Sequence, residues 1–160
     1  MRVKILIFII SFMMFGCATN QAKMSKQDVI LNNVKNATDQ VTLDMTKMYI
    51  EKAYLWRNFQ PIVPKGGRAM KASIRIKTVD GIIVPPTVKV KEVWFVYNDK
   101  AWKSVNIKEK RRFENILDIV VYDGAKLQTG IKVDVVVVLT DKFGNLAYLK
   151  KKSQTIRKVW

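Results

Sequence analysis

The feature that most constrains the fold is an alternation of apolar and polar residues with a period of two, which recurs along the chain after residue 49. The segment "KASIRIKT" places Ala72, Ile74, Ile76 and Thr78 on one face and Lys71, Ser73, Arg75 and Lys77 on the other. Such alternation is typical of a β-strand with one buried face. No long helical pattern appears after residue 50, so the sequence predicts an all-β domain.

Turn residues separate this strand from the next ones. Asp80-Gly81 forms a turn signal, and Pro85-Pro86 blocks any helix. In "TVKVKEVWFVYNDKAWKSVNI", Asn98-Asp99 tolerates the positive φ of a tight hairpin. The apolar phase shifts by one residue between Val90 and Val93, which predicts a β-bulge near Glu92.

The second half of the chain contains further strand patterns. "ILDIVVYDG" predicts one strand, and "GIKVDVVVVLTDKFGNLAYLKKK" predicts a hairpin with a short loop at Gly144-Asn145. The alternation of Ile156, Lys158 and Trp160 suggests a last strand. Seven or eight strands at regular spacing predict a single antiparallel β-sandwich over residues 49–160.

This strand count and the late hairpin resemble an immunoglobulin-like or fibronectin-III-like sandwich, although no cysteine pair accompanies the pattern. The segments "YLWRNFQP" and "VWFVYNDKAW" also resemble small uncharacterised envelope lipoproteins that carry such a domain. The resemblance implies the fold and an envelope location, and it brings no specific activity with it.

The N-terminal residues have the layout of an export signal. Arg2 and Lys4 precede an apolar run from Ile5 to Phe15 that only Ser11 interrupts. This run is too short for a membrane-spanning helix, which needs about 20 residues. Residues 1–16 are therefore interpreted as a signal peptide.

Gly16 then precedes Cys17, the only cysteine of the chain. The arrangement resembles the lipobox of bacterial lipoproteins, with Met14 where leucine is usual and Phe15 larger than the usual residue. The resemblance implies cleavage between Gly16 and Cys17, a diacylglycerol on the Cys17 thiol and an acyl chain on the new amine. Ala18 in place of aspartate favours the periplasmic face of the outer membrane in a Gram-negative envelope. The alternative is an ordinary cleaved signal with a chance cysteine.

Residues 17–48 are interpreted as a lipidated tether that contains an amphipathic helix. Apolar positions with spacings of three and four support the helix, namely Leu31, Val34, Thr38, Val41, Met45 and Met48. A loose tether and a coiled-coil dimer are the alternatives. If the whole tether were flexible, its two ends would lie roughly 30 Å apart as an r.m.s. distance.

The composition favours binding over catalysis. The chain has 29 basic and 13 acidic residues, and removal of Arg2 and Lys4 with the signal leaves a net charge of +14. Such a field favours anionic partners. No histidine is present, so the commonest general base is missing and a cysteine–histidine zinc site is excluded within this chain. No cofactor, metal or catalytic residue is expected, and a hydrolase with Ser–Lys chemistry is a minor alternative.

Two basic runs form the candidate contact surface. They are Lys108, Lys110, Arg111 and Arg112 of "KEKRR", expected on a loop between strands, and Lys150, Lys151 and Lys152. Solvated charge that keeps the protein soluble is the alternative role. The four tryptophans are expected in core or edge packing, with an exposed aromatic face or sugar stacking as alternatives; they are Trp56, Trp94, Trp102 and Trp160.

These features predict a non-catalytic envelope lipoprotein that acts as a protein-binding or scaffolding module. Its partners would be membrane lipid, through acylated Cys17, and an envelope protein. The alternative is a module that binds anionic lipid or cell-wall glycan through basic loops. Nucleic acid is not an expected partner, because exported and tethered proteins rarely meet it.

Overall fold

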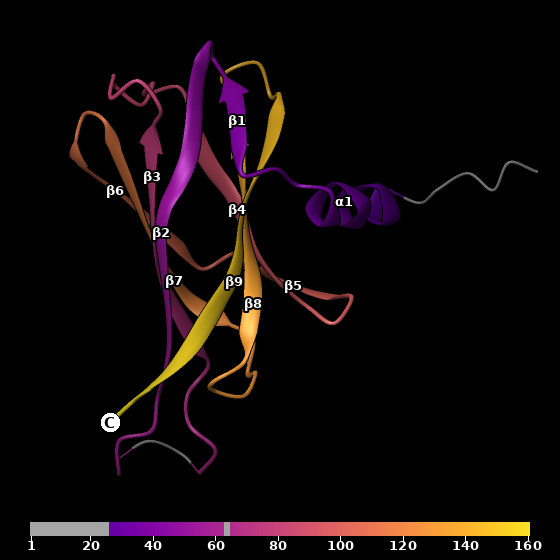
Figure 1. The fold of residues 1–160 in the computed structure, drawn as a ribbon, viewed down its shortest axis with the longest axis vertical. Helices are drawn as coiled ribbons and strands as arrows, with labels where there is room; N and C mark the ends of the chain where they lie inside the picture. The colour runs from indigo at the N-terminus through magenta and orange to yellow at the C-terminus, as the bar shows by residue number, and fades with distance from the viewer. Residues whose placement is uncertain (1–25, 63–64) are drawn as a thin grey trace, which may run out of the picture.

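Nine strands follow one short helix along the described chain (Figure 1). The computed structural model describes residues 26–62 and 65–160, so the predicted signal peptide and Cys17 lie outside the described residues. The elements are α1 (Lys26–Lys35), β1 (Gln40–Leu43), β2 (Thr46–Asn58), β3 (Met70–Thr78), β4 (Lys89–Tyr97), β5 (Lys100–Ser104), β6 (Ile107–Phe113), β7 (Ile116–Gly124), β8 (Lys132–Thr140) and β9 (Leu146–Val159).

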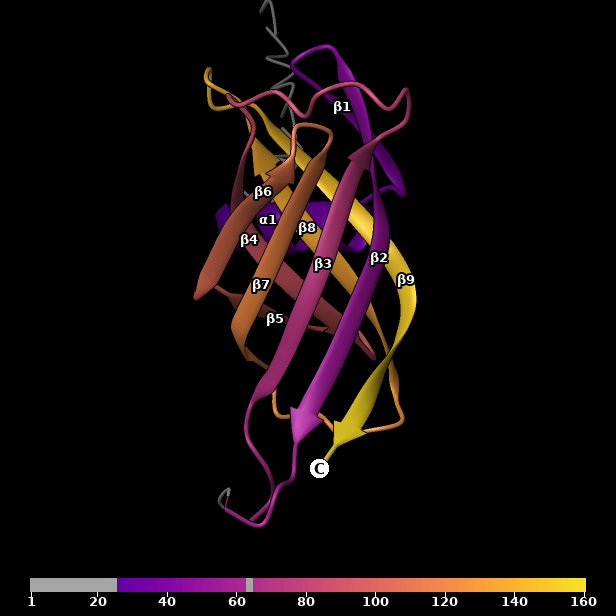
Figure 2. The same ribbon diagram turned by 90° about the vertical axis from the view of Figure 1, so that its left-hand side faces the viewer.

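All nine strands belong to one curled sheet with the order β5-β4-β8-β9-β2-β3-β7-β6, to which β1 adds beside β2. Figure 2 shows a first wall of β6, β7, β3 and β2 in front, with β4, β5 and β8 of a second wall behind it. The prediction of an all-β domain is confirmed. The sheet is not purely antiparallel, however, because β2 pairs with β9 in parallel.

Strand β9 joins the two walls. Residues up to Thr155 pair antiparallel with β8, and Ile156 onward pairs with β2. Shortly before this change of partner, the β8–β9 register shifts between Val133 and Val135. Ser153 lies at this shift with a φ of 56°, and its backbone N–H donates to Asp134 Oδ1 at 2.9 Å. The separate last strand suggested by Ile156, Lys158 and Trp160 is therefore the end of β9, which bends from one wall to the other and stops at Val159, one residue before Trp160.

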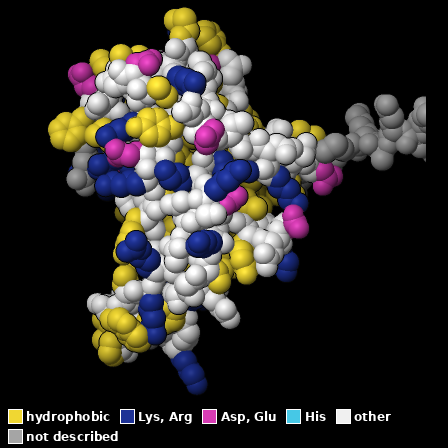
Figure 3. All heavy atoms as spheres, viewed as in Figure 1, with side chains coloured by type: hydrophobic (Ala, Val, Ile, Leu, Met, Phe, Trp, Pro, Cys, Tyr) yellow, Lys and Arg dark blue, Asp and Glu magenta, His cyan; other side chains and the backbone are white. Residues whose placement is uncertain are grey.

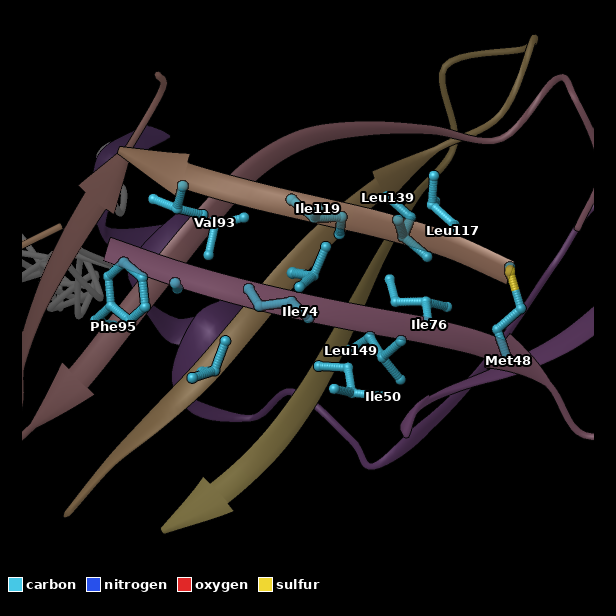
Figure 4. Close-up of a cluster of buried hydrophobic side chains, with 14 of the residues drawn as sticks. Met48, Ile50, Ile74, Ile76, Val93, Phe95, Leu117, Ile119, Leu139 and Leu149 are labelled. Carbon is cyan, nitrogen blue, oxygen red and sulfur yellow. The ribbon is translucent and has the colours of Figure 1, made fainter. Parts of the chain in front are cut away.

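The core lies between the two walls. Figure 4 shows side chains of β2, β3 and β7, such as Ile50, Ile74 and Ile119, pointing toward those of β4, β8 and β9. The largest fully buried side chain is Phe95 of β4. The inward positions of "KASIRIKT" are all buried, so the alternation correctly identified the core face of β3.

Two local predictions are also confirmed. The register between β4 and β8 shifts between Val90 and Glu92, where the bulge was predicted. Asn98 and Asp99 have φ values of 46° and 60° and connect β4 to β5 as a tight hairpin.

The predicted helix is shorter than its apolar spacing suggested. It ends at Lys35, and Val41 and Met48 lie in β1 and β2, which pair with each other. Strands therefore begin at Gln40, ahead of the expected start at residue 49. The helix-like spacing is misleading because cross-strand pairing across the turn at Asp44 and Met45 decides the conformation of this segment.

Helix α1 covers the outer face of the second wall. Val34 is fully buried against Trp94, Val136 and Val138. This contact explains why Val135 to Leu139 are all buried, since one face of β8 packs in the core and the other packs under α1. Trp94 thus lies beneath the helix rather than on an open face.

Helix α1 is also fastened to β9 at its C-terminal end. Lys150 Nζ donates to the carbonyl oxygen of Lys35, and the Thr38 N–H donates to the Tyr148 carbonyl oxygen at 3.2 Å. The helix is therefore an integral part of the folded body.

Candidate contact surface

The first basic run lies on a strand, which corrects the prediction of a loop. Residues 108–112 form the middle of β6 at one end of the sheet order, paired with β7. Lys108 and Lys110 are exposed. Local charge suggested a loop, but pairing with the strongly apolar β7 imposes the extended conformation.

Arg111 is half-buried and joins β6 to the segment before β4. Its guanidinium donates to the carbonyl oxygens of Val84 at 2.9 Å, Val88 at 2.6 Å and Pro85 at 3.3 Å. Glu109 accepts a bond from the Val90 N–H at 2.7 Å nearby. Side chains thus bridge β6 to the start of β4, and the Arg111 guanidinium is bonded to backbone carbonyl oxygens of the fold.

In the second basic run, too, some side chains bond to the backbone of the fold and others are exposed. Lys151 Nζ donates to the carbonyl oxygens of Ile50 at 3.1 Å and Glu51 at 3.0 Å. These carbonyls belong to β2 at its bulge, where the register with β3 shifts. Lys150 holds α1, and only Lys152 is exposed.

We expect replacement of Lys151 by methionine to lower the free energy of unfolding by about 1–3 kcal/mol, because two backbone acceptors lose a charged donor. Lys152→Met is the matched control on the neighbouring residue and is expected to change the free energy of unfolding by less than about 0.5 kcal/mol. Urea unfolding of both variants measures the difference. Equal effects would show that the Lys151 bridge does not stabilise the fold.

The two basic runs do not form a single surface. Strand β6 stands at one end of the sheet order, and β7, β3 and β2 separate it from β9. Of the predicted contact residues whose side chains are described, Lys108, Lys110 and Lys152 remain exposed. The side chain of Arg112 lies outside the described part of the structure.

A different set of cations gathers on the outer face of the first wall. We call it the cation–aromatic row; it consists of Arg157 on β9, Trp56 and Tyr54 on β2, Lys71 on β3 and Tyr122 on β7. Strand pairing brings these residues together, because Trp56 lies opposite Lys71 on one side and opposite Arg157 on the other. The row therefore crosses four adjacent strands on the face away from the core.

The rings and the charges of this row are in contact. The Tyr54 and Trp56 ring centroids are 5.4 Å apart. The Arg157 guanidinium lies 5.3 Å from the Tyr54 centroid, and Lys71 Nζ lies 5.7 Å from the Tyr122 centroid. Tyr54 and Tyr122 are about two-fifths exposed, at 40% and 41%. The rings hold the cations in place and leave both kinds of group accessible.

Acidic side chains on the same wall are occupied by a separate ion-pair network. Lys77 Nζ lies 2.5 Å from Glu51 Oε1, and Arg75 Nε lies 2.7 Å from Asp118 Oδ1. The Lys77 hydrogen bond lowers the pKa of Glu51, and the Asp118 hydrogen bond raises the pKa of Arg75. Among the described residues, no salt bridge joins Lys71 or Arg157 to a carboxylate, so the row keeps a positive charge.

Sequence inspection missed the row because its members come from strands far apart in the chain. Trp56 and Arg157 are neighbours only through the parallel pairing of β2 with β9. The one local signal was the alternation of Tyr54 and Trp56, which places both rings on one face of a strand.

No metal-binding cluster is found among the described residues. Residues 26–62 and 65–160 hold no group of three or more acidic, cysteine or histidine side chains suited to a metal ion. Ser104, the buried serine of this part of the chain, bonds Asp123 and not a lysine. The helix in these residues is also too short to cross a bilayer.

Comparison of the chain with protein-family models, curated proteins and solved structures finds no match in any of the three.

Proposed function

We propose that this protein is a non-catalytic lipoprotein of the bacterial cell envelope whose β-sheet body is a binding module held close to the membrane. The sole cysteine behind an apolar run supports the lipid anchor. Two or three acyl chains are enough for stable anchoring, whereas one is not. The observation that carries the proposal is the docking of α1 and β1 on the body, because it leaves only a short link to Cys17.

The length of this link can be bounded from covalent geometry. Between Cys17 and the start of α1 at Lys26, an extended chain reaches about 30 Å at about 3.5 Å per residue. The sequence alone allowed a tether through residue 48, which would reach roughly 100 Å. The body would thus be held within about one domain diameter of the bilayer surface.

The cation–aromatic row is the proposed binding surface, and an acidic protein segment of the envelope is the proposed partner. Exposed tyrosine, tryptophan and arginine are the residues most enriched at protein-binding hot spots. The positive charge of Lys71 and Arg157 would steer an acidic partner to this face. We further propose that the two walls correspond to the two sheets of an immunoglobulin-like sandwich, since their inner faces share one core.

A second candidate partner is an acidic cell-wall glycan. Exposed aromatic rings beside cations also suit a sugar that carries a carboxylate. The aromatic ring stacks on the face of the sugar, and the cation pairs with the carboxylate. The same row would serve both partners, so the two candidates differ in what is captured and not in the residues used.

The test is crosslinking in intact cells followed by mass spectrometry, comparing the parent protein with Lys71→Glu/Arg157→Glu. The parent should yield specific protein crosslinks at the row, and the double variant should lose them by tenfold or more (~1.4 kcal/mol per tenfold). Lys132→Glu, on exposed Lys132 of β8, is the control and should keep them.

Two further readouts separate the alternatives. Salt-sensitive sedimentation with cell-wall sacculi that the double variant abolishes would favour the glycan. Crosslinks unaffected by the double variant would overturn the row as the binding surface. An intact mass that shows an unmodified Cys17 would overturn the lipid anchor.

A further inference from the structure

One end of the curled sheet is unusually apolar. Four connections meet there: the β1–β2 turn, the β3–β4 connection, the β6–β7 turn and the β8–β9 turn (Figures 1 and 2). We call this end the apolar pole. Seven of the thirteen large hydrophobic residues that are exposed in the described parts of the chain lie at it. They are Met45, Val79, Ile82, Ile83, Phe113, Phe143 and Leu146.

Five of these side chains are more than half exposed, from 51% for Ile83 to 95% for Met45. Figure 3 shows hydrophobic side chains at the upper end of the molecule and a second group near its lower end, whereas Lys and Arg side chains occupy much of its middle. Scattered single hydrophobic residues are normal on a protein surface, whereas a contiguous group such as Ile82, Ile83 and Phe113, which line one hollow together, indicates an interaction site.

The backbone beneath these side chains is held in place. The Val84 N–H donates to the Glu114 carbonyl oxygen at 2.8 Å, which ties the β3–β4 connection to the β6–β7 turn. Thr78 Oγ1 donates to the Ile82 carbonyl oxygen at 2.6 Å, and Thr87 bonds the Asp44 carboxylate. The apolar pole is therefore a preformed platform rather than a set of loose loops.

Phe113, Ile82 and Ile83 line two shallow hollows between two of these connections, each with a volume of about 380 Å³. The charges around the pole are of mixed sign, with exposed Asp80 and Glu114 as well as Lys47. Attraction to an anionic surface therefore does not explain the pole, and its distinguishing property is exposed apolar area.

We propose that the apolar pole inserts its side chains into the interface of the lipid bilayer that holds Cys17. This inference rests on the proposed lipid anchor. The link from Cys17 ends at α1, which lies nearer to the apolar pole than to the end that carries the C-terminus (Figures 1 and 2). A link of about 30 Å keeps the pole within reach of the surface. Apolar loop tips gain free energy in the interface through burial of their exposed area.

This orientation leaves the cation–aromatic row free. The row lies on the outer face of the first wall, so a pole that points at the bilayer turns this face sideways, toward other envelope components. In this single orientation the lipid anchor and the apolar pole both contact the bilayer, and the cation–aromatic row stays accessible to a partner.

The test places tryptophan reporters at the pole of the full lipidated protein in phosphatidylcholine vesicles. Phe113→Trp and Phe143→Trp report on the pole, and Tyr122→Trp, at an exposed site on the first wall, is the matched control. Vesicles made with acyl-chain-brominated lipid quench tryptophan in contact with the bilayer interior. The fluorescence that each reporter adds to that of the parent protein is compared with and without bromine, and vesicle flotation is measured on the same samples.

We expect the pole reporters to lose at least about twice the fraction of fluorescence that the Tyr122→Trp reporter loses, equally at low and high salt. Protein that floats with the vesicles but shows no excess quenching at the pole would overturn the insertion and leave the anchor standing. Quenching that disappears in high salt would also overturn it, because the contact would then be electrostatic. Protein that fails to float would overturn both the anchor and the insertion.

Discussion

Replacing Phe95 by alanine is expected to lower the free energy of unfolding by about 3–5 kcal/mol. Phe95 is fully buried on β4, where it pairs with Trp102 of β5 and Val135 of β8. Its ring fills the space between the two walls, as Figure 4 shows, and alanine would leave a cavity that the paired strands cannot close. Urea unfolding should show a lower midpoint with an unchanged slope.

Phe143→Ala provides the matched control for this substitution. Phe143 lies in the β8–β9 turn and is 77% exposed, so we expect its loss to change the free energy of unfolding by less than about 0.5 kcal/mol. A Phe95→Ala protein as stable as the Phe143→Ala protein would mean that the two walls do not share the core described here.

The second large effect is expected at Arg111. Substitution by methionine should lower the free energy of unfolding by about 2–4 kcal/mol, because the carbonyl oxygens of Val84, Pro85 and Val88 lose their charged donor. A lysine at this position is expected to restore only part of the loss, since one ammonium group cannot reproduce the planar guanidinium fork. Thermal and urea unfolding measure both variants.

Lys110→Met tests the same strand without the bridge. Lys110 is exposed, so its replacement should be nearly neutral for stability. If Arg111→Met were also neutral and instead weakened binding to anionic vesicles, Arg111 would be a contact residue, as its sequence context first suggested.

Local pattern was sufficient to predict several strands. The alternation in β3, the strand at Ile116–Gly124 and the hairpin of β8 with β9 follow from side-chain period and turn residues within each segment. The bulge near Glu92 could also be predicted, because a shift in the apolar alternation within one strand is visible in the residues of that strand.

Other features depend on partners that are distant in sequence. Arg111 reaches carbonyls more than twenty residues away, and Lys151 reaches Ile50 across 101 residues, so neither bond has a local signal. Val41 and Met48 fit a helical spacing and a strand equally well, and only their pairing across the turn at Asp44 selects the strand. The cation–aromatic row likewise exists only once β9 lies beside β2.

The bend of β9 from one wall to the other also sets the order in which the body can form. Because a chain is synthesised from its N-terminus, β2 is made long before β9 and cannot pair with its parallel neighbour until residues 156–159 have been made. Pairings of such long sequence separation form slowly, because the intervening loop must close first. The junction between the two walls therefore forms last, once the C-terminal residues of β9 are available to pair with β2.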